Sequence, residues 1–220
     1  MIDSKMNILL FAGLGLSLQL TANLVNSPVI WVFKNLGFKP VSEFSIKSSF
    51  DFFSAIITVC LLPAVFEEVL FRKFVFNDLR LLSKKAAIVF SAVFFAFSHM
   101  SFYSFGAIFF VGLIFGILRS KDYPLIYIMI AHFCLNLSAI LITMIGKTGF
   151  SPYFNKFYFL FAAASAAASV YTFKRLSNKP EQLEFNYYER PLLQFLSIIA
   201  KIPYTYIYIF IFVIIGIINL

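Results

Sequence analysis

The chain has 220 residues, of which 61% are hydrophobic and only 13% are charged. Because a soluble domain carries roughly 25% charged residues, this composition and the mean hydropathy of +0.89 exclude an ordinary soluble protein. The net charge of +8 does not indicate nucleic acid, because lysine and arginine of membrane proteins gather in short loops beside anionic lipid. We therefore predict an integral membrane protein that contacts membrane lipid and binds no nucleic acid.

Apolar runs, taken in chain order, predict an all-α, polytopic transmembrane bundle of about seven spans, each needing about 20 residues. The first run covers residues 7–25 and is expected to end at residues 26–28, where a proline follows asparagine and serine. The second begins near Asp51 and continues to about Leu79, and Pro63 within it should free a backbone carbonyl. The other runs cover residues 86–100, 103–118, 124–145, 155–173 and 202–219.

Polar linkers and basic loops organise these runs within one integral membrane domain. We divide the chain into an N-terminal span with a polar linker (1–50), a core (51–150) and C-terminal spans (151–220). Basic residues concentrate in three alternate loops, at residues 72–85, 119–121 and 174–190. Alternate loops share a side of the membrane, and the positive-inside rule makes that side cytoplasmic. We predict a multi-pass protein of the cell membrane.

Two adjacent carboxylates and a guanidinium stand inside the second apolar run, after a stretch (52–66) without any charge. An ionisable group at membrane depth is costly, and it is usually functional. On a helix, Glu68 and Arg72 are four residues apart and can pair. Glu67 is rotated about 100° from Glu68. We therefore expect Arg72 to be buried beside Glu68, and Glu67 to be left available for chemistry.

The two histidines of the chain also fall within apolar runs. Phe95 precedes His99 by one helical turn, and His132 precedes Asn136 by one turn on the same face. Each of these polar groups would be expensive if it faced lipid. We therefore expect them to converge with Glu67 in the interior of the bundle.

Three motifs in order resemble the signatures of the CPBP family, which comprises type II CAAX prenyl endopeptidases and bacteriocin-processing or immunity proteins, also called Abi proteins. The motifs are Glu67-Glu68-x-x-x-Arg72, Phe95-x-x-x-His99 and His132-x-x-x-Asn136. One such motif alone is a weak signal, but three in order that use both histidines are specific. The resemblance covers about residues 57–145. It implies an intramembrane endopeptidase with a peptide or a prenylated protein as its substrate.

The resemblance also implies a role for each motif residue. Glu67 would be the general base that activates water, and His99 would help to bind that water. His132 and Asn136 would stabilise the oxyanion of the tetrahedral intermediate, because imidazole and amide groups can donate to developing negative charge. The structural supports would be Glu68, Arg72 and Phe95.

The sequence allows more than one cofactor requirement and more than one function. Glu67, His99 and His132 could supply a zinc site, and the family is often described as metalloproteases. No His-Glu-x-x-His helix is present, and two histidines on separate spans are a thin ligand set, so we favour metal-independent hydrolysis that depends on Glu67. The competing functions are a non-catalytic bacteriocin immunity or scaffold protein and an ion-coupled transporter, which also uses buried charges.

Overall fold

The computed structural model describes residues 4–37, 46–81, 83–146, 148 and 151–179, and every regular element within them is a helix. The α-helices are α1 (Ser4–Asn35), α2 (Ser49–Ala55), α3 (Leu62–Glu68), α4 (Phe76–Arg80), α5 (Lys84–Ser98), α6 (Phe105–Ser120), α7 (Leu125–Gly146), α8 (Ser151–Lys156) and α9 (Tyr158–Ser177). Two π-helical segments, η1 (Ile56–Leu61) and η2 (Val69–Val75), join α2, α3 and α4. The predicted all-α architecture is confirmed.

Among the described residues, three helices are long and apolar enough to cross a membrane: α1, the continuous helix Ser49–Arg80, and α7. The apolar helix α6 is shorter, at 16 residues, than the roughly 20 that a span needs. These helices agree with a helical membrane bundle. The count of about seven spans stays a prediction, and the last predicted span, 202–219, lies outside the described residues.

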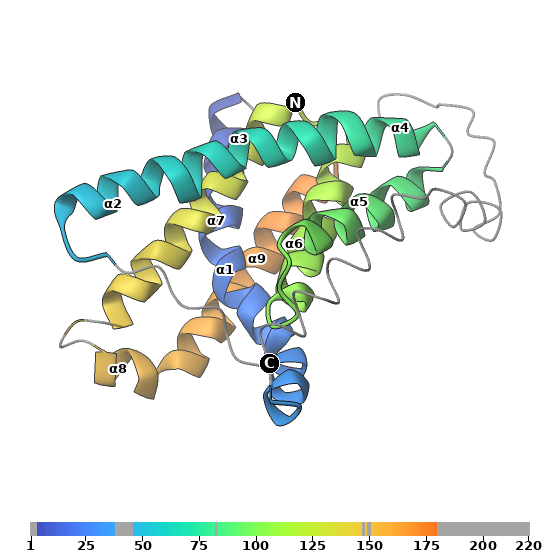
Figure 1. Cartoon of the computed structure of the whole chain (residues 1–220). Coiled ribbons are helices and arrows are strands. Elements are labelled where there is room, and N and C mark those ends of the chain that lie inside the picture. Colours follow the sequence, from blue (N-terminus) through green and yellow to red (C-terminus); the bar gives the residue numbers. More distant parts are fainter. Residues whose placement is uncertain (1–3, 38–45, 82, 147, 149–150, 180–220) are drawn as a thin grey trace.

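The second predicted run forms one continuous rod from α2 to α4 (Figure 1), which confirms its extension to about Leu79. The rod begins at a capping box in which the Ser48 side chain accepts from the backbone of Asp51. Pro63 lacks the N–H that a carbonyl four residues earlier would accept. That carbonyl belongs to Val59, and the Nδ2 of Asn136 donates to it at 2.8 Å.

The predicted break after the first run is wrong, because α1 continues through residues 26–28 to Asn35. Pro28 deprives the Leu24 carbonyl of its helical donor. The Ser27 hydroxyl donates to that same carbonyl at 2.8 Å. A neighbouring side chain thus replaces the missing backbone bond, and the helix is not interrupted.

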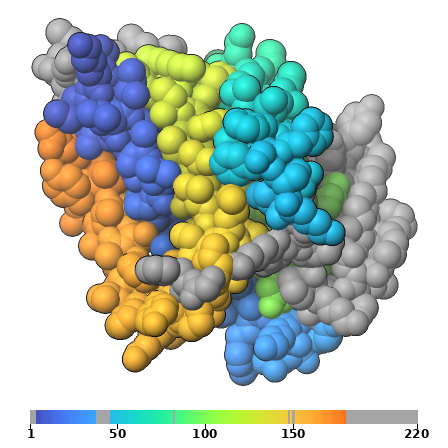
Figure 2. Space-filling view, turned by 90° about the vertical axis from the view of Figure 1, so that its left-hand side faces the viewer, coloured from blue at the N-terminus to red at the C-terminus, as the bar shows by residue number. Residues whose placement is uncertain are grey.

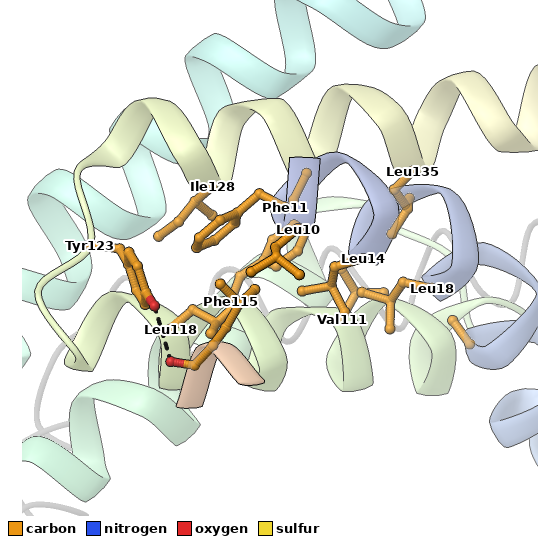
Figure 3. Close-up of a cluster of buried hydrophobic side chains, with 13 residues drawn as sticks. Leu10, Phe11, Leu14, Leu18, Val111, Phe115, Leu118, Tyr123, Ile128 and Leu135 are labelled. Atoms are coloured by element: carbon orange, nitrogen blue, oxygen red, sulfur yellow. Dashed lines mark hydrogen bonds between the residues drawn. The ribbon is translucent and has the colours of Figure 1, made fainter. Parts of the chain in front are cut away.

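The main core lies where α1 packs against α6, α7 and α9. In Figure 2, α7 (yellow) lies between α1 (blue) and the start of the long rod (cyan). Figure 3 shows the buried cluster, whose labelled members are Leu10, Phe11, Leu14, Leu18, Val111, Phe115, Leu118, Tyr123, Ile128 and Leu135. The Tyr123 hydroxyl donates to the Leu176 carbonyl at 3.1 Å and ties the turn before α7 to the end of α9. This core fixes α7 relative to α1 and α6, and so positions the groups described next.

Candidate active site

The long rod contributes a buried ion pair, as expected from the sequence. The side chains of Glu68 and Arg72 are both fully buried, and Arg72 Nε lies 3.4 Å from Glu68 Oε2. Those two atoms form an ion pair without hydrogen-bond geometry. The guanidinium carbon of Arg72 also lies 4.6 Å from the centre of the Phe95 ring, and such cation–π contacts strengthen where water is absent. The expectation that Arg72 is buried beside Glu68 is confirmed.

The helix α7 presents His132 to the other oxygen of the same carboxylate. His132 is 3% exposed, and its Nδ1 lies 2.8 Å from Glu68 Oε1. A nitrogen that faces a carboxylate oxygen at this distance carries the proton. In the neutral imidazole the lone pair of His132 is therefore at Nε2.

His99 lies one residue beyond the end of α5, in the turn that follows, rather than within a helical span as the apolar run suggested. The next residue, Met100, has a φ of 49°, so the chain cannot continue as a right-handed helix there. His99 Nδ1 lies 2.8 Å from the Phe95 carbonyl oxygen. A carbonyl only accepts, so Nδ1 again carries the proton, and Nε2 presents its lone pair.

Glu67 completes the site by facing both imidazoles. Its Oε2 lies 3.7 Å from His99 Nε2 and 3.9 Å from His132 Nε2. This oxygen is buried and has no hydrogen-bond partner among the described residues. With neutral rings, three lone-pair atoms therefore face one another, too far apart for direct hydrogen bonds. A water molecule can donate its two protons to two of these three atoms, and a cation could contact all three.

A cavity of about 200 Å³ opens beside the two histidines. Polar groups in its wall include Gln19, Asn23, His99, His132 and Asn136. Asn136 uses one N–H for the Val59 carbonyl, and its carboxamide retains a second N–H. The structure therefore brings Phe95, His99, His132 and Asn136 of the second and third motifs to one cavity, and Glu67 of the first motif faces the two histidines.

Sequence reasoning missed two of these cavity residues, Gln19 and Asn23 of α1. They are amide side chains four residues apart within an apolar run. The same signal, polar residues one turn apart at membrane depth, drew attention to His132 and Asn136. The same criterion, applied to the apolar run 7–25, would also have selected Gln19 and Asn23.

Zinc would need Glu67, His99 and His132 as ligands. Tetrahedral zinc with bonds of about 2.0–2.1 Å holds its ligand atoms about 3.3 Å apart, whereas Glu67 Oε2 lies 3.7 Å from His99 Nε2 and 3.9 Å from His132 Nε2. Among the described residues, no group of three His, Cys, Asp or Glu side chains has the geometry of a metal site. The residues as arranged do not form a zinc site, and they would have to move closer to make one.

The comparison with known families supports a helical intramembrane protease at the level of the family. Residues 49–138 match the family described as type II CAAX prenyl endopeptidase Rce1-like. The matched segment contains both carboxylates, both histidines and Asn136, and it supports assignment of the chain to the CPBP family of intramembrane proteases. No curated protein and no solved structure matches the chain. The helix α1 lies outside the matched segment.

Proposed function

We propose that the chain is a multi-pass endopeptidase of the cell membrane that hydrolyses a peptide bond near the membrane interface, in a CAAX-type substrate or a leader peptide, with water activated by Glu67. The observation that carries this proposal is the position of Glu67 Oε2, 3.7 and 3.9 Å from two imidazole nitrogens. The match to an endopeptidase family favours this reading over an immunity, scaffold or transport function.

The first step places water between Glu67 and the Nε2 atoms of His99 and His132. Glu67 takes a proton from this water as the new bond to the substrate carbonyl carbon forms, which is general base catalysis. Glu68 cannot serve as the base, because Arg72 and His132 Nδ1 already hold its two oxygens. The proton on Glu67 then passes to the leaving amine as the carbon–nitrogen bond breaks.

The oxyanion of the intermediate needs hydrogen-bond donors in the cavity wall. The second N–H of Asn136 is one such donor, because the first is held by the Val59 carbonyl. His132 donates from Nε2 only as an imidazolium, since its Nδ1 proton is directed at Glu68. Asn136 is therefore the donor that acts with neutral histidines, and His132 joins it when protonated.

The direct test is cleavage of a fluorogenic, farnesylated CAAX peptide by the purified protein. Removing a general base typically costs 10²–10⁴-fold in rate, so Glu67→Gln should lower kcat by about 10²-fold or more. Asp78→Asn is the matched control, because it neutralises an exposed carboxylate on the same rod, away from the cavity. Equal rates for wild type and Glu67→Gln would remove the catalytic role of Glu67.

The metal question has its own measurement. We expect the rate to survive dialysis against a strong zinc chelator, because the site as arranged is too open for a zinc ion. Loss of activity with chelator, restored by added zinc, would instead assign Glu67, His99 and His132 as its ligands. Bound zinc would act there as a Lewis acid and lower the pKa of its water.

A further inference from the structure

Two amide side chains of α1, Gln19 and Asn23, line the cavity that also holds His99, His132 and Asn136. We propose that Gln19 and Asn23 are substrate-binding residues, which hydrogen-bond the peptide backbone of an extended substrate across the cavity from the catalytic groups. The proposal rests on the proposed protease function. It adds a substrate-recognition element from a helix that lies outside the family match.

Gln19 and Asn23 differ from the neighbouring polar residues of α1 in their hydrogen bonding, and this difference supports a binding role. Thr21 hydrogen-bonds Ser169 at 3.0 Å, and Asn26 donates to the Tyr103 carbonyl at 2.8 Å. Within the described part of the chain, neither Gln19 nor Asn23 has a hydrogen-bond partner, although both side chains are partly buried. Polar groups in a membrane interior are expensive when unpaired. The neighbouring polar residues hold helices together, whereas these two are directed into an open space.

Close packing of α1 against α7 positions Gln19 and Asn23 beside the cavity. Gly15, Gln19 and Asn23 follow one another at intervals of four residues and so share a helix face. A Cβ at Gly15 would overlap the Ala131 carbonyl oxygen, so α1 lies directly against α7 at that turn. The next two turns of the same face then border the part of α7 that carries His132.

The spacing of the two amides fits an extended peptide. Four residues along a helix rise about 6 Å, and two residues along an extended chain rise about 6.6 Å. Alternate peptide groups of an extended chain point to the same side. A carboxamide both donates and accepts, so each side chain can pair with one backbone amide. Neither residue is charged, so the pair suits backbone recognition rather than a charged substrate side chain.

The test uses a fluorescent, farnesylated CAAX peptide with Gln19→Ala, Asn23→Ala and the double variant. Each neutral hydrogen bond lost should raise KM about three- to tenfold with little change in kcat. Asn35→Ala, which removes an exposed amide at the far end of α1, should leave both constants unchanged. Peptide binding is measured in parallel by fluorescence anisotropy in the Glu67→Gln background, where cleavage is slow.

A second peptide, with one backbone amide replaced by an ester, separates binding from a structural role. Wild type should lose affinity for this peptide, whereas the double variant should lose less, because its partners are already gone. Unchanged KM and binding in the double variant would overturn the inference while leaving the protease function intact. Weakened binding without any cleavage by wild type would keep the binding site and overturn the protease. No binding by wild type would overturn both.

Discussion

Adjacent carboxylates at positions 67 and 68 have opposite surroundings, because a helix turns about 100° per residue. Glu68 is fully buried, and its two oxygens are held by Arg72 and His132. The side chain of Glu67 is 29% exposed and faces His99 and His132 across gaps that exceed a hydrogen bond. The same residue type therefore serves as a structural anchor at one position and stays available for proton transfer at the next.

The buried ion pair gives a prediction at this scale. Arg72→Met leaves the Glu68 carboxylate buried without its cation, which should lower the free energy of unfolding by about 3–5 kcal/mol. The double variant Glu68→Gln, Arg72→Met removes both charges and should recover most of that loss. Denaturation of the purified protein in detergent measures both.

Arg175→Met is the control for the arginine experiment, because its guanidinium contacts only an exposed hydroxyl, that of Tyr171, among the hydrogen bonds described. This variant should leave stability unchanged. If the Glu68–Arg72 double variant were as unstable as Arg72→Met, the uncompensated charge could not be the cause. Lost packing of the long side chain against Phe95 would then explain the result.

At the scale of elements, two π-helical segments flank Glu67 and Glu68, and side chains from other helices donate hydrogen bonds to backbone carbonyls of these segments. At the end of η2, the Phe76 N–H bonds the Phe71 carbonyl five residues back. After this bond the pairing returns to the four-residue interval of an α-helix, so the next carbonyl, that of Arg72, receives no backbone N–H. Arg119 Nε of α6 donates to it at 3.2 Å. Asn136 acts in the same way at η1, so α6 and α7 fix the rod on both sides of Glu67.

The contact between α1 and α7 gives a prediction for a pair of glycines. Gly15→Ala would place a Cβ on the Ala131 carbonyl oxygen, and backbone cannot yield as a flexible side chain can. Overpacking of this kind should lower the free energy of unfolding by about 1–3 kcal/mol. Gly13→Ala is the control, because nothing lies within 4 Å of its added methyl group, and alanine favours a helix. Thermal unfolding that destabilised the two variants equally would contradict the close contact.

At the scale of the whole molecule, the three basic loops meet at one end of the bundle. Arg80 at the end of α4 pairs with Asp122 at 2.6 Å, in the turn between α6 and α7. The Nζ of Lys179, just after α9, donates to the Asp122 carbonyl at 3.2 Å. The described parts of these loops therefore lie together, as loops on one side of a membrane would. Which face of the membrane they meet stays a prediction.

Cysteine labelling in intact cells tests that orientation. In a background with Cys60→Ala and Cys134→Ala, Lys85→Cys should react with a membrane-impermeant maleimide only after the cells are permeabilised. Leu36→Cys, just after the C-terminal end of α1, lies at the opposite end of the bundle and should react in intact cells. The physical reason is the excess of lysine and arginine at the end of the bundle that carries Lys85, because the positive-inside rule assigns that end to the cytoplasm. The opposite labelling pattern would invert the topology.

The sequence alone determined the features that depend on local composition and spacing. Apolar runs identified the helices, and the cost of charge in lipid singled out the motif residues. The four-residue interval between Glu68 and Arg72 predicted their pairing. The same local reasoning failed at Pro28, because the hydroxyl of Ser27 satisfies the freed carbonyl there.

Only the tertiary structure decided how those residues meet. His99 faces Glu67, His132 Nδ1 donates to Glu68, and Asn136 donates to the Val59 carbonyl. These contacts join residues that are 32 to 77 positions apart in the chain. Such contacts depend on the rotation and depth of each helix against its neighbours, which periodicity within one segment does not specify. The same cause brought Gln19 and Asn23 of α1 into the cavity, because the packing at Gly15 is a property of two helices together.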